Sequence, residues 1–257
     1  MSILFREIIY GPVHSRRLGV SLGVNLLPLN GKLCSFNCIY CECGWNEDNR
    51  VDRPRFNSRE DVRDTLKAKL QEMRKEGTLP DVITFAGNGE PTLHPEFEGI
   101  IDDTIALRDE FAPNAKISVL SNATQLHREE VCRALAKVDN NILKLDSAIN
   151  DTAKAIDLPR GEYDTERIIE QMQRFKGQMT LQTMFLRGNH AGEIIDNTTE
   201  LEIEAWLTAV RRISPRDVMV YSIDRATPCQ ELEKISREEL ESIAERVRAL
   251  GFTCSVA

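Results

Sequence analysis

The chain has 257 residues, of which 41% are hydrophobic and 29% are charged, and its formal net charge is −8 at pH 7. This composition is sufficient for one large core and is compatible with a single α/β barrel, and the acidic balance gives no indication of a surface for nucleic acid. Residues 1–19 lack the apolar core of a signal peptide, and no later run approaches a membrane span. We therefore expect a cytoplasmic protein without membrane segments.

Short runs rich in β-branched residues predict buried strands. In chain order they span residues 19–27, 81–87, 116–122, 141–147, 179–186 and 217–223. Apolar residues at helical spacing lie between them, as in residues 62–73 and 203–210. A capping box of Ser236 and Glu239 begins the last predicted helix, which ends at Gly251 and precedes a final strand, FTCSVA.

Strands that alternate with helices predict right-handed βαβ units and a parallel sheet. Six units are too few to close an eight-stranded barrel. We therefore predict an α/β fold, a partial (β/α)6 TIM-like barrel with a short C-terminal helix and strand, in one domain spanning residues 1–257. The long interval after the first strand contains a cysteine-rich loop, residues 28–57, at the end of the strand where barrel enzymes place their chemistry.

Four of the seven cysteines lie in the stretch GKLCSFNCIYCEC, residues 31–43, with the spacing Cys34-x3-Cys38-x2-Cys41 and a fourth thiol at Cys43. In a reducing compartment, clustered cysteines more often hold metal than form disulfides. Zinc usually takes four ligands from two separated pairs, which this loop does not offer. Thiolates also select iron–sulfur clusters, and three of them would leave the fourth iron of a [4Fe–4S] cube open. A cube closed by Cys43 would instead indicate an electron carrier.

A second motif ends the second predicted strand, in the segment FAGNGEPTLHP. Gly87 and Gly89 would let the backbone approach a ligand closely, although an ordinary turn before the next helix would use the same residues. The fourth predicted strand ends with Lys144, Asp146 and Ser147, whose side chains alternate between the barrel interior and the helix layer.

The pattern Cys34-x3-Cys38-x-Tyr40-Cys41 resembles the defining motif of the radical S-adenosylmethionine (radical SAM) superfamily. The opening YGPVHSRRLGVSLGVNLLPL and the later GNGEPTL resemble one subgroup, the Fe–S oxidoreductases related to the enzymes of wyosine base formation in transfer RNA. The resemblance implies a [4Fe–4S] cluster on Cys34, Cys38 and Cys41, with SAM as the second cofactor. The cofactor-binding residues that it implies are Tyr40, Gly87, Asn88, Gly89, Glu90, Ser121, Asn122, Asp146 and Arg160.

The same resemblance implies an enzyme of oxidoreductase or transferase type. The reduced cluster would cleave SAM to a 5′-deoxyadenosyl radical, which would abstract a hydrogen atom from an unidentified substrate. We expect an external electron donor, of the flavodoxin or ferredoxin kind, and a substrate that is a small molecule, a peptide or RNA. Two alternatives stay open: a glycyl-radical-enzyme activase that acts on a partner protein, and a closed-cluster electron-transfer protein.

Cys43 and Cys229 are the candidate catalytic residues, because either thiol could return a hydrogen atom to a substrate radical. Together they could also help to bind a second metal, or both could be incidental loop thiols. The segment HSRRLG, residues 14–19, could form a basic clamp for a phosphate or carboxylate, or only a surface turn. We expect substrate specificity in the polar strand ends at residues 185–190 and 222–228.

Overall fold

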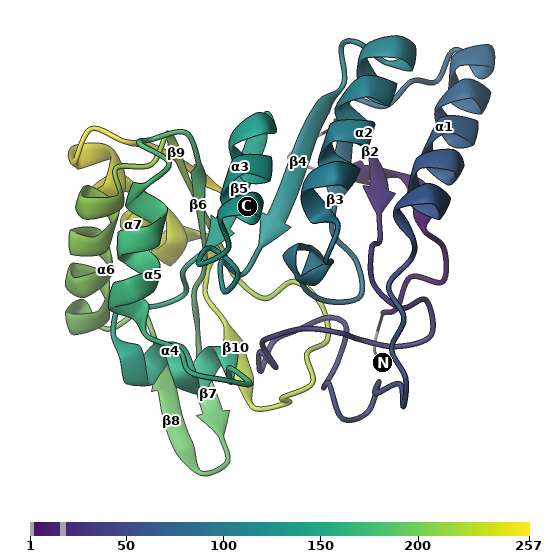
Figure 1. The fold of residues 1–257 in the computed structure, drawn as a ribbon. Helices are drawn as coiled ribbons and strands as arrows, with labels where there is room; N and C mark the ends of the chain where they lie inside the picture. Colours follow the sequence, from purple (N-terminus) through teal and green to yellow (C-terminus); the bar gives the residue numbers. More distant parts are fainter. Residues whose placement is uncertain (1–2, 16–18) are drawn as a thin grey trace.

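The computed structural model describes residues 3–15 and 19–257 (Figure 1). Arg16 and Arg17 of the expected basic clamp therefore lie outside the described residues. None of the described helices is both long and apolar enough to cross a membrane.

One sheet of eight strands forms the centre of the fold (Figure 1). In spatial order its strands are β1 (Ile9–Ser15), β2 (Gly19–Val24), β3 (Val82–Phe85), β4 (Lys116–Ser121), β5 (Asn140–Lys144), β6 (Thr180–Met184), β9 (Asp217–Tyr221) and β11 (Thr253–Val256). All neighbours from β2 to β11 are parallel, and β1 is antiparallel to β2. The predicted strands are all present, in one parallel sheet, so the predicted partial barrel is confirmed.

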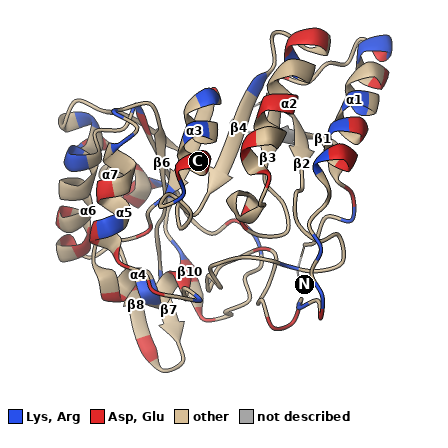
Figure 2. Cartoon of the chain, viewed as in Figure 1, with Lys and Arg blue, Asp and Glu red and all other residues tan. Residues whose placement is uncertain are grey.

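Helices connect consecutive parallel strands and pack against one another in succession. They are α1 (Arg59–Glu76), α2 (Phe97–Phe111), α3 (Glu129–Lys137), α4 (Asn150–Asp157), α5 (Thr165–Gln173), α6 (Glu200–Ile213) and α7 (Arg237–Ala249), with a short 3-10 helix, η1 (Pro91–Leu93). The predicted apolar faces of α1 and α6 are buried, and the capping box at Ser236 is present. Figure 2 shows Lys and Arg interspersed with Asp and Glu along these helices.

Two features of the fold have no counterpart in the sequence prediction. Strand β1 contains Gly11 and Pro12, a residue pair that is typical of turns. The pairing of β1 with β2 shifts register between Tyr10 and Val13, as in a β-bulge, so both residues fit within the strand. A second sheet has the order β10 (Leu232–Lys234), β7 (Leu186–His190) and β8 (Glu193–Asp196). Its strands are short and few of their residues are buried, so they carry little of the hydrophobic alternation that reveals a strand.

Replacing Leu66, which is fully buried on α1, with Ala should lower the free energy of unfolding by about 2–5 kcal/mol. The substitution removes packed carbon atoms and leaves a cavity between α1 and the sheet. Lys67→Ala, on the exposed face of the same helix, should change stability by less than about 0.5 kcal/mol. Urea unfolding followed by circular dichroism measures both variants, and equal losses would contradict the packing described here.

Candidate active site

A cavity of about 320 Å³ lies at the carboxyl ends of the central strands, beside the cysteine loop. Figure 1 shows this loop crossing below the strand ends. Ten of the residues predicted for the site line the cavity: Cys34, Cys38, Tyr40, Cys41, Cys43, Gly87, Gly89, Glu90, Ser121 and Asn122. Later strands add Lys144, Gln182, Met184 and Tyr221. The fold therefore brings side chains from most of the chain to one place.

The cysteine loop is held in position by backbone pairing with the loop that follows β3. Leu33 forms a parallel bridge with Gly89, in which the Leu33 N–H donates to the Asn88 carbonyl at 2.9 Å and the Glu90 N–H donates to the Leu33 carbonyl at 3.1 Å. Gly89 has a φ of +134°, and a Cβ atom there would lie 1.9 Å from the Leu33 oxygen. Only glycine permits this approach, which explains the second glycine of the motif.

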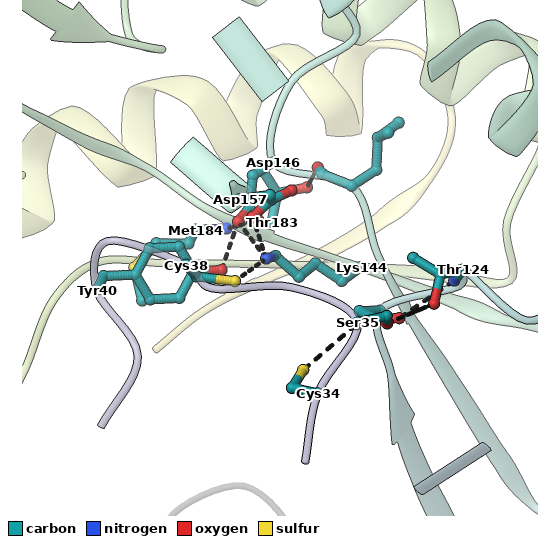
Figure 3. Close-up of polar contacts among 12 residues, drawn as sticks. Cys34, Ser35, Cys38, Tyr40, Thr124, Lys144, Asp146, Asp157, Thr183 and Met184 are labelled. Carbon is teal, nitrogen blue, oxygen red and sulfur yellow. Dashed lines mark hydrogen bonds and ion pairs between the residues drawn. The ribbon is translucent and has the colours of Figure 1, made fainter. Parts of the chain in front are cut away.

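Each of the three motif cysteines has a polar side chain near it. The Lys144 ammonium donates to Cys38 Sγ at 3.1 Å (Figure 3). The Asn122 amide donates to Cys34 Sγ at 3.7 Å. The Lys32 ammonium, which donates to the Gly44 carbonyl at 2.6 Å, lies close enough to Cys41 to lower the pKa of that thiol. Such donors stabilise thiolate sulfur, and hydrogen bonds to sulfur are also a means of tuning an iron–sulfur cluster.

The electrostatic surroundings of the thiols differ. Desolvation raises the pKa of Cys34 to about 12. Hydrogen bonding by the neighbouring Cys43 thiol, together with the Lys32 ammonium, lowers the pKa of Cys41 to about 5. Cys43 Sγ also donates to the Gly87 carbonyl at 3.5 Å, so this fourth thiol lies between Cys41 and the glycine motif. Its place in the same cavity as the other three makes it part of the site.

The donor set fits an iron–sulfur cluster. Within residues 3–15 and 19–257, no three His, Cys, Asp or Glu side chains converge closely enough to ligate one metal ion. The three thiols are instead distributed around a cavity, as suits a cluster whose several irons each take one cysteine.

Lys144 is the centre of a buried charge network (Figure 3). Its ammonium forms ion pairs with Asp157 and, at 3.1 Å, with Asp146, and both carboxylates are almost completely buried. Burial alone would lower the pKa of Lys144, but the two carboxylates raise it well above its usual value. The Tyr40 hydroxyl donates to Asp146, which also accepts from the Met184 N–H at 2.9 Å. The predicted Tyr40 and Asp146 thus belong to one network beside Cys38.

Glu90 connects the β3 loop to the end of β4. Its carboxylate is 2% exposed and accepts from the Ser121 hydroxyl at 2.9 Å and from the Asn122 N–H at 2.7 Å. Burial raises the pKa of Glu90, and these hydrogen bonds oppose the rise. Because Asn122 also contacts Cys34, the second motif and the first are parts of one hydrogen-bond network.

Four predicted residues do not line the cavity: Asp146, which lies in the network of Lys144 described above, and Asn88, Arg160 and Cys229. The Asn88 side chain is fully buried and bonds the backbone of Phe5 and Pro28, each at 2.8 Å, so it fixes the chain near the N-terminus. Arg160 is exposed, and its backbone N–H donates to the Ser35 carbonyl. Cys229 packs behind the cysteine loop, where its thiol donates to the Asn189 carbonyl at 3.2 Å.

Lys32 and Asp157 are site residues that the sequence reasoning missed. Lys32 precedes the first motif cysteine by two positions, and this proximity was the only available signal. Asp157 ends α4, far along the chain, and no motif indicates that its carboxylate reaches Lys144.

A second cavity of about 320 Å³ adjoins the first. The two share Glu42, Met184, Tyr221, Asp224 and Arg225. Glu42, between two cysteines of the loop, forms an ion pair with Arg225 at 2.6 Å. The strand end at residues 222–228 therefore reaches the site as expected, whereas residues 186–190 form β7 and do not line the cavity.

Comparisons with known proteins agree with this arrangement. The profile of the Radical SAM superfamily matches residues 31–201, which is more than half of the chain. A protein of Brachyspira hyodysenteriae named GTPase Obg is 30% identical over 252 residues, covering 96% of this chain and 34% of its own length. A UPF0026 protein of Methanocaldococcus jannaschii is 32% identical over 183 residues, covering 70% of this chain and 54% of its own length. The chain thus spans about a third to a half of these two relatives.

Solved structures share the fold at low sequence identity. A radical SAM methyltransferase from Sphaerobacter thermophilus superimposes with a TM-score of 0.67 and 16% identity, over 92% of this chain and 65% of that one. Archaeal TYW1 gives a TM-score of 0.57 and 15% identity, over 89% of this chain and 71% of that one. The resemblance to wyosine enzymes therefore extends to the fold. By its cysteine motif, its fold and the profile match, this chain belongs to the radical SAM superfamily, whose members use a [4Fe–4S] cluster and SAM.

Proposed function

We propose that this chain is the catalytic core of an enzyme that cleaves SAM reductively and abstracts a hydrogen atom from a substrate. The main support for this proposal is that the three motif cysteines, the glycine motif and the polar end of β4 line the same cavity. In this proposal Cys34, Cys38 and Cys41 hold the cluster. The chain forms one domain, since one sheet contains strands from both of its ends.

When bound, the cluster and SAM together supply the radical, and the residues of this chain position and shield them. Gly87 and Gly89 present backbone to a ligand at close range. Lys144 and Arg225 line the cavity, whereas the exposed Arg160 does not. Lys144, which lies beside Cys38, is the cation suited to the carboxylate of SAM. Tyr40, Met184 and Ile223 form an apolar part of the lining that excludes water.

The partners are proposals of the same kind. The cluster requires an external one-electron donor of the flavodoxin or ferredoxin type. The substrate enters from the second cavity, whose shared wall contains Glu42, Asp224 and Arg225. A wall with charges of both signs suits a polar substrate, and the choice among a small molecule, a peptide and RNA is left to experiment.

The anaerobically reconstituted and reduced protein should convert SAM to 5′-deoxyadenosine, measured by mass spectrometry. Cys38→Ala should abolish the product because it removes a cluster ligand. Cys229→Ala is the matched control, since it removes a buried thiol outside the cavity and should retain the product. An intact cluster that does not cleave SAM would sink the proposal.

Cys43→Ala should retain the iron content and the absorption spectrum of the wild-type cluster, because three thiols suffice in the proposed site. Iron and sulfide analysis measures the first and visible spectroscopy the second. Loss of the cluster in this variant, with retention in Cys229→Ala, would show that Cys43 is a fourth ligand. The electron-carrier alternative would then be favoured.

Lys144→Gln should weaken SAM binding by roughly one to two orders of magnitude, because a charge-assisted hydrogen bond contributes about 1.5–3 kcal/mol. Arg160→Gln should leave the affinity within about twofold, since binding would keep every cavity contact. Anaerobic calorimetry measures both affinities, and circular dichroism checks that Lys144→Gln keeps its fold despite two unpaired buried carboxylates. A large loss in Arg160→Gln alone would restore the role predicted from the sequence.

A further inference from the structure

Lys32 is a buried lysine directly beside the cysteine loop. Lys32 is only 5% exposed, and its ammonium donates to the Gly44 carbonyl at 2.6 Å. The Gly44 N–H in turn donates to the Cys41 carbonyl at 2.8 Å, so the ammonium lies in the turn that contains Cys41. Cys41, Cys34 and Cys38 are the charged groups that act on it most strongly. In the part of the chain that the structure describes, no Asp or Glu forms an ion pair with Lys32.

Lys144, the other buried lysine of the site, has different charged partners. Two buried carboxylates, Asp146 and Asp157, balance that ammonium, although it also contacts a cysteine. Lys32 donates to a neutral carbonyl oxygen, and the anionic groups near it are cysteine sulfurs, not carboxylates. The two lysines therefore differ in the kind of counter-charge that faces them: carboxylates for Lys144 and thiolates for Lys32.

A buried ammonium is costly unless an anion compensates for its lost hydration. With no carboxylate in that place, the compensating charge is that of the cysteine thiolates and of the cluster that they would hold. Lys32 is also fixed in place. Its backbone N–H donates to the Asn49 carbonyl at 2.8 Å, and the adjacent Leu33 is paired with Gly89. The cation is thus built into the loop at a constant position.

We propose that Lys32 is the counter-charge of the cluster and raises its reduction potential. The proposal rests on the proposed ligation of a cluster by Cys34, Cys38 and Cys41. Reduction adds one electron, taken from the external donor, to a group that is already anionic. A fixed cation in a site of low polarity stabilises the reduced form more than the oxidised form, so it makes the electron easier to accept. Lys32 thus acts on the reaction indirectly, through the reduction potential of the cluster, and does not itself touch the substrate.

The test compares midpoint potentials in an anaerobic redox titration with dithionite, followed by electron paramagnetic resonance. Lys32→Gln keeps an N–H donor for the Gly44 carbonyl and removes the charge, whereas Lys32→Arg keeps the charge. Lys67→Gln, on the exposed face of α1, controls for the loss of one positive charge far from the loop. We expect Lys32→Gln to bind wild-type amounts of iron and sulfide. At a fixed potential, its ratio of reduced to oxidised cluster should fall about tenfold, a shift of about 59 mV in midpoint potential for one electron. Lys32→Arg and Lys67→Gln should keep the wild-type potential.

Each other result has a definite meaning. An unchanged potential in Lys32→Gln, or an equal fall in Lys32→Gln and Lys32→Arg, would overturn the proposal, since the charge would then not be the cause. If Lys32→Gln retains no cluster, iron content becomes the measurement. If Lys32→Arg retains the cluster while Lys32→Gln loses it, the site requires the positive charge, as proposed. Loss of the cluster in both variants would overturn the proposal. A wild-type protein that assembles no cluster would instead contradict the proposed function itself.

Discussion

The pairing of Leu33 with Gly89 determines where the cysteine loop lies, and the rest of the site depends on it. Two backbone hydrogen bonds join a loop without regular secondary structure to the rigid end of the parallel sheet. Cys34, the first motif cysteine, directly follows Leu33 in the chain. The Glu90 carboxylate accepts hydrogen bonds from Ser121 and Asn122, and the Asn122 side chain donates to Cys34. A side chain at position 89 would separate the two segments by its bulk alone.

Buried charge is distributed unevenly around the three thiols. An amide contacts Cys34, an ammonium balanced by two carboxylates contacts Cys38, and an ammonium without a carboxylate lies near Cys41. Hydrogen bonds and charge near sulfur both act on the electronics of an iron–sulfur cluster. In the proposed cluster, the three irons bound by cysteine would therefore have different surroundings, although their three thiolate ligands are chemically identical.

The sequence was sufficient for the parallel strands and the motif residues because both depend on local signals. Buried parallel strands such as Val82–Phe85 are apolar on both faces, and the cysteine spacing lies within one loop. Strand β1 and the β7–β8–β10 sheet gave no such signal. Asn88 and Arg160 lie in the expected segments, but neither of them lines the cavity. A pattern locates a loop, but the direction of each side chain depends on contacts with residues far away, such as Phe5 for Asn88.

The distances in sequence between the partners of the cysteine loop have a consequence for what holds that loop in place. The loop is tied to Ile3 through Glu42, to Asp157 through Asn37, to Ile156 through Ile39, and to Cys229 through the Ile39 carbonyl. These partners come from both halves of the chain, so the shape of the loop depends on contacts of high sequence separation. In small zinc domains the metal organises the chain, and folding and metal binding are one event. In this chain, by contrast, the polypeptide's own long-range hydrogen bonds already hold the cysteine loop in place.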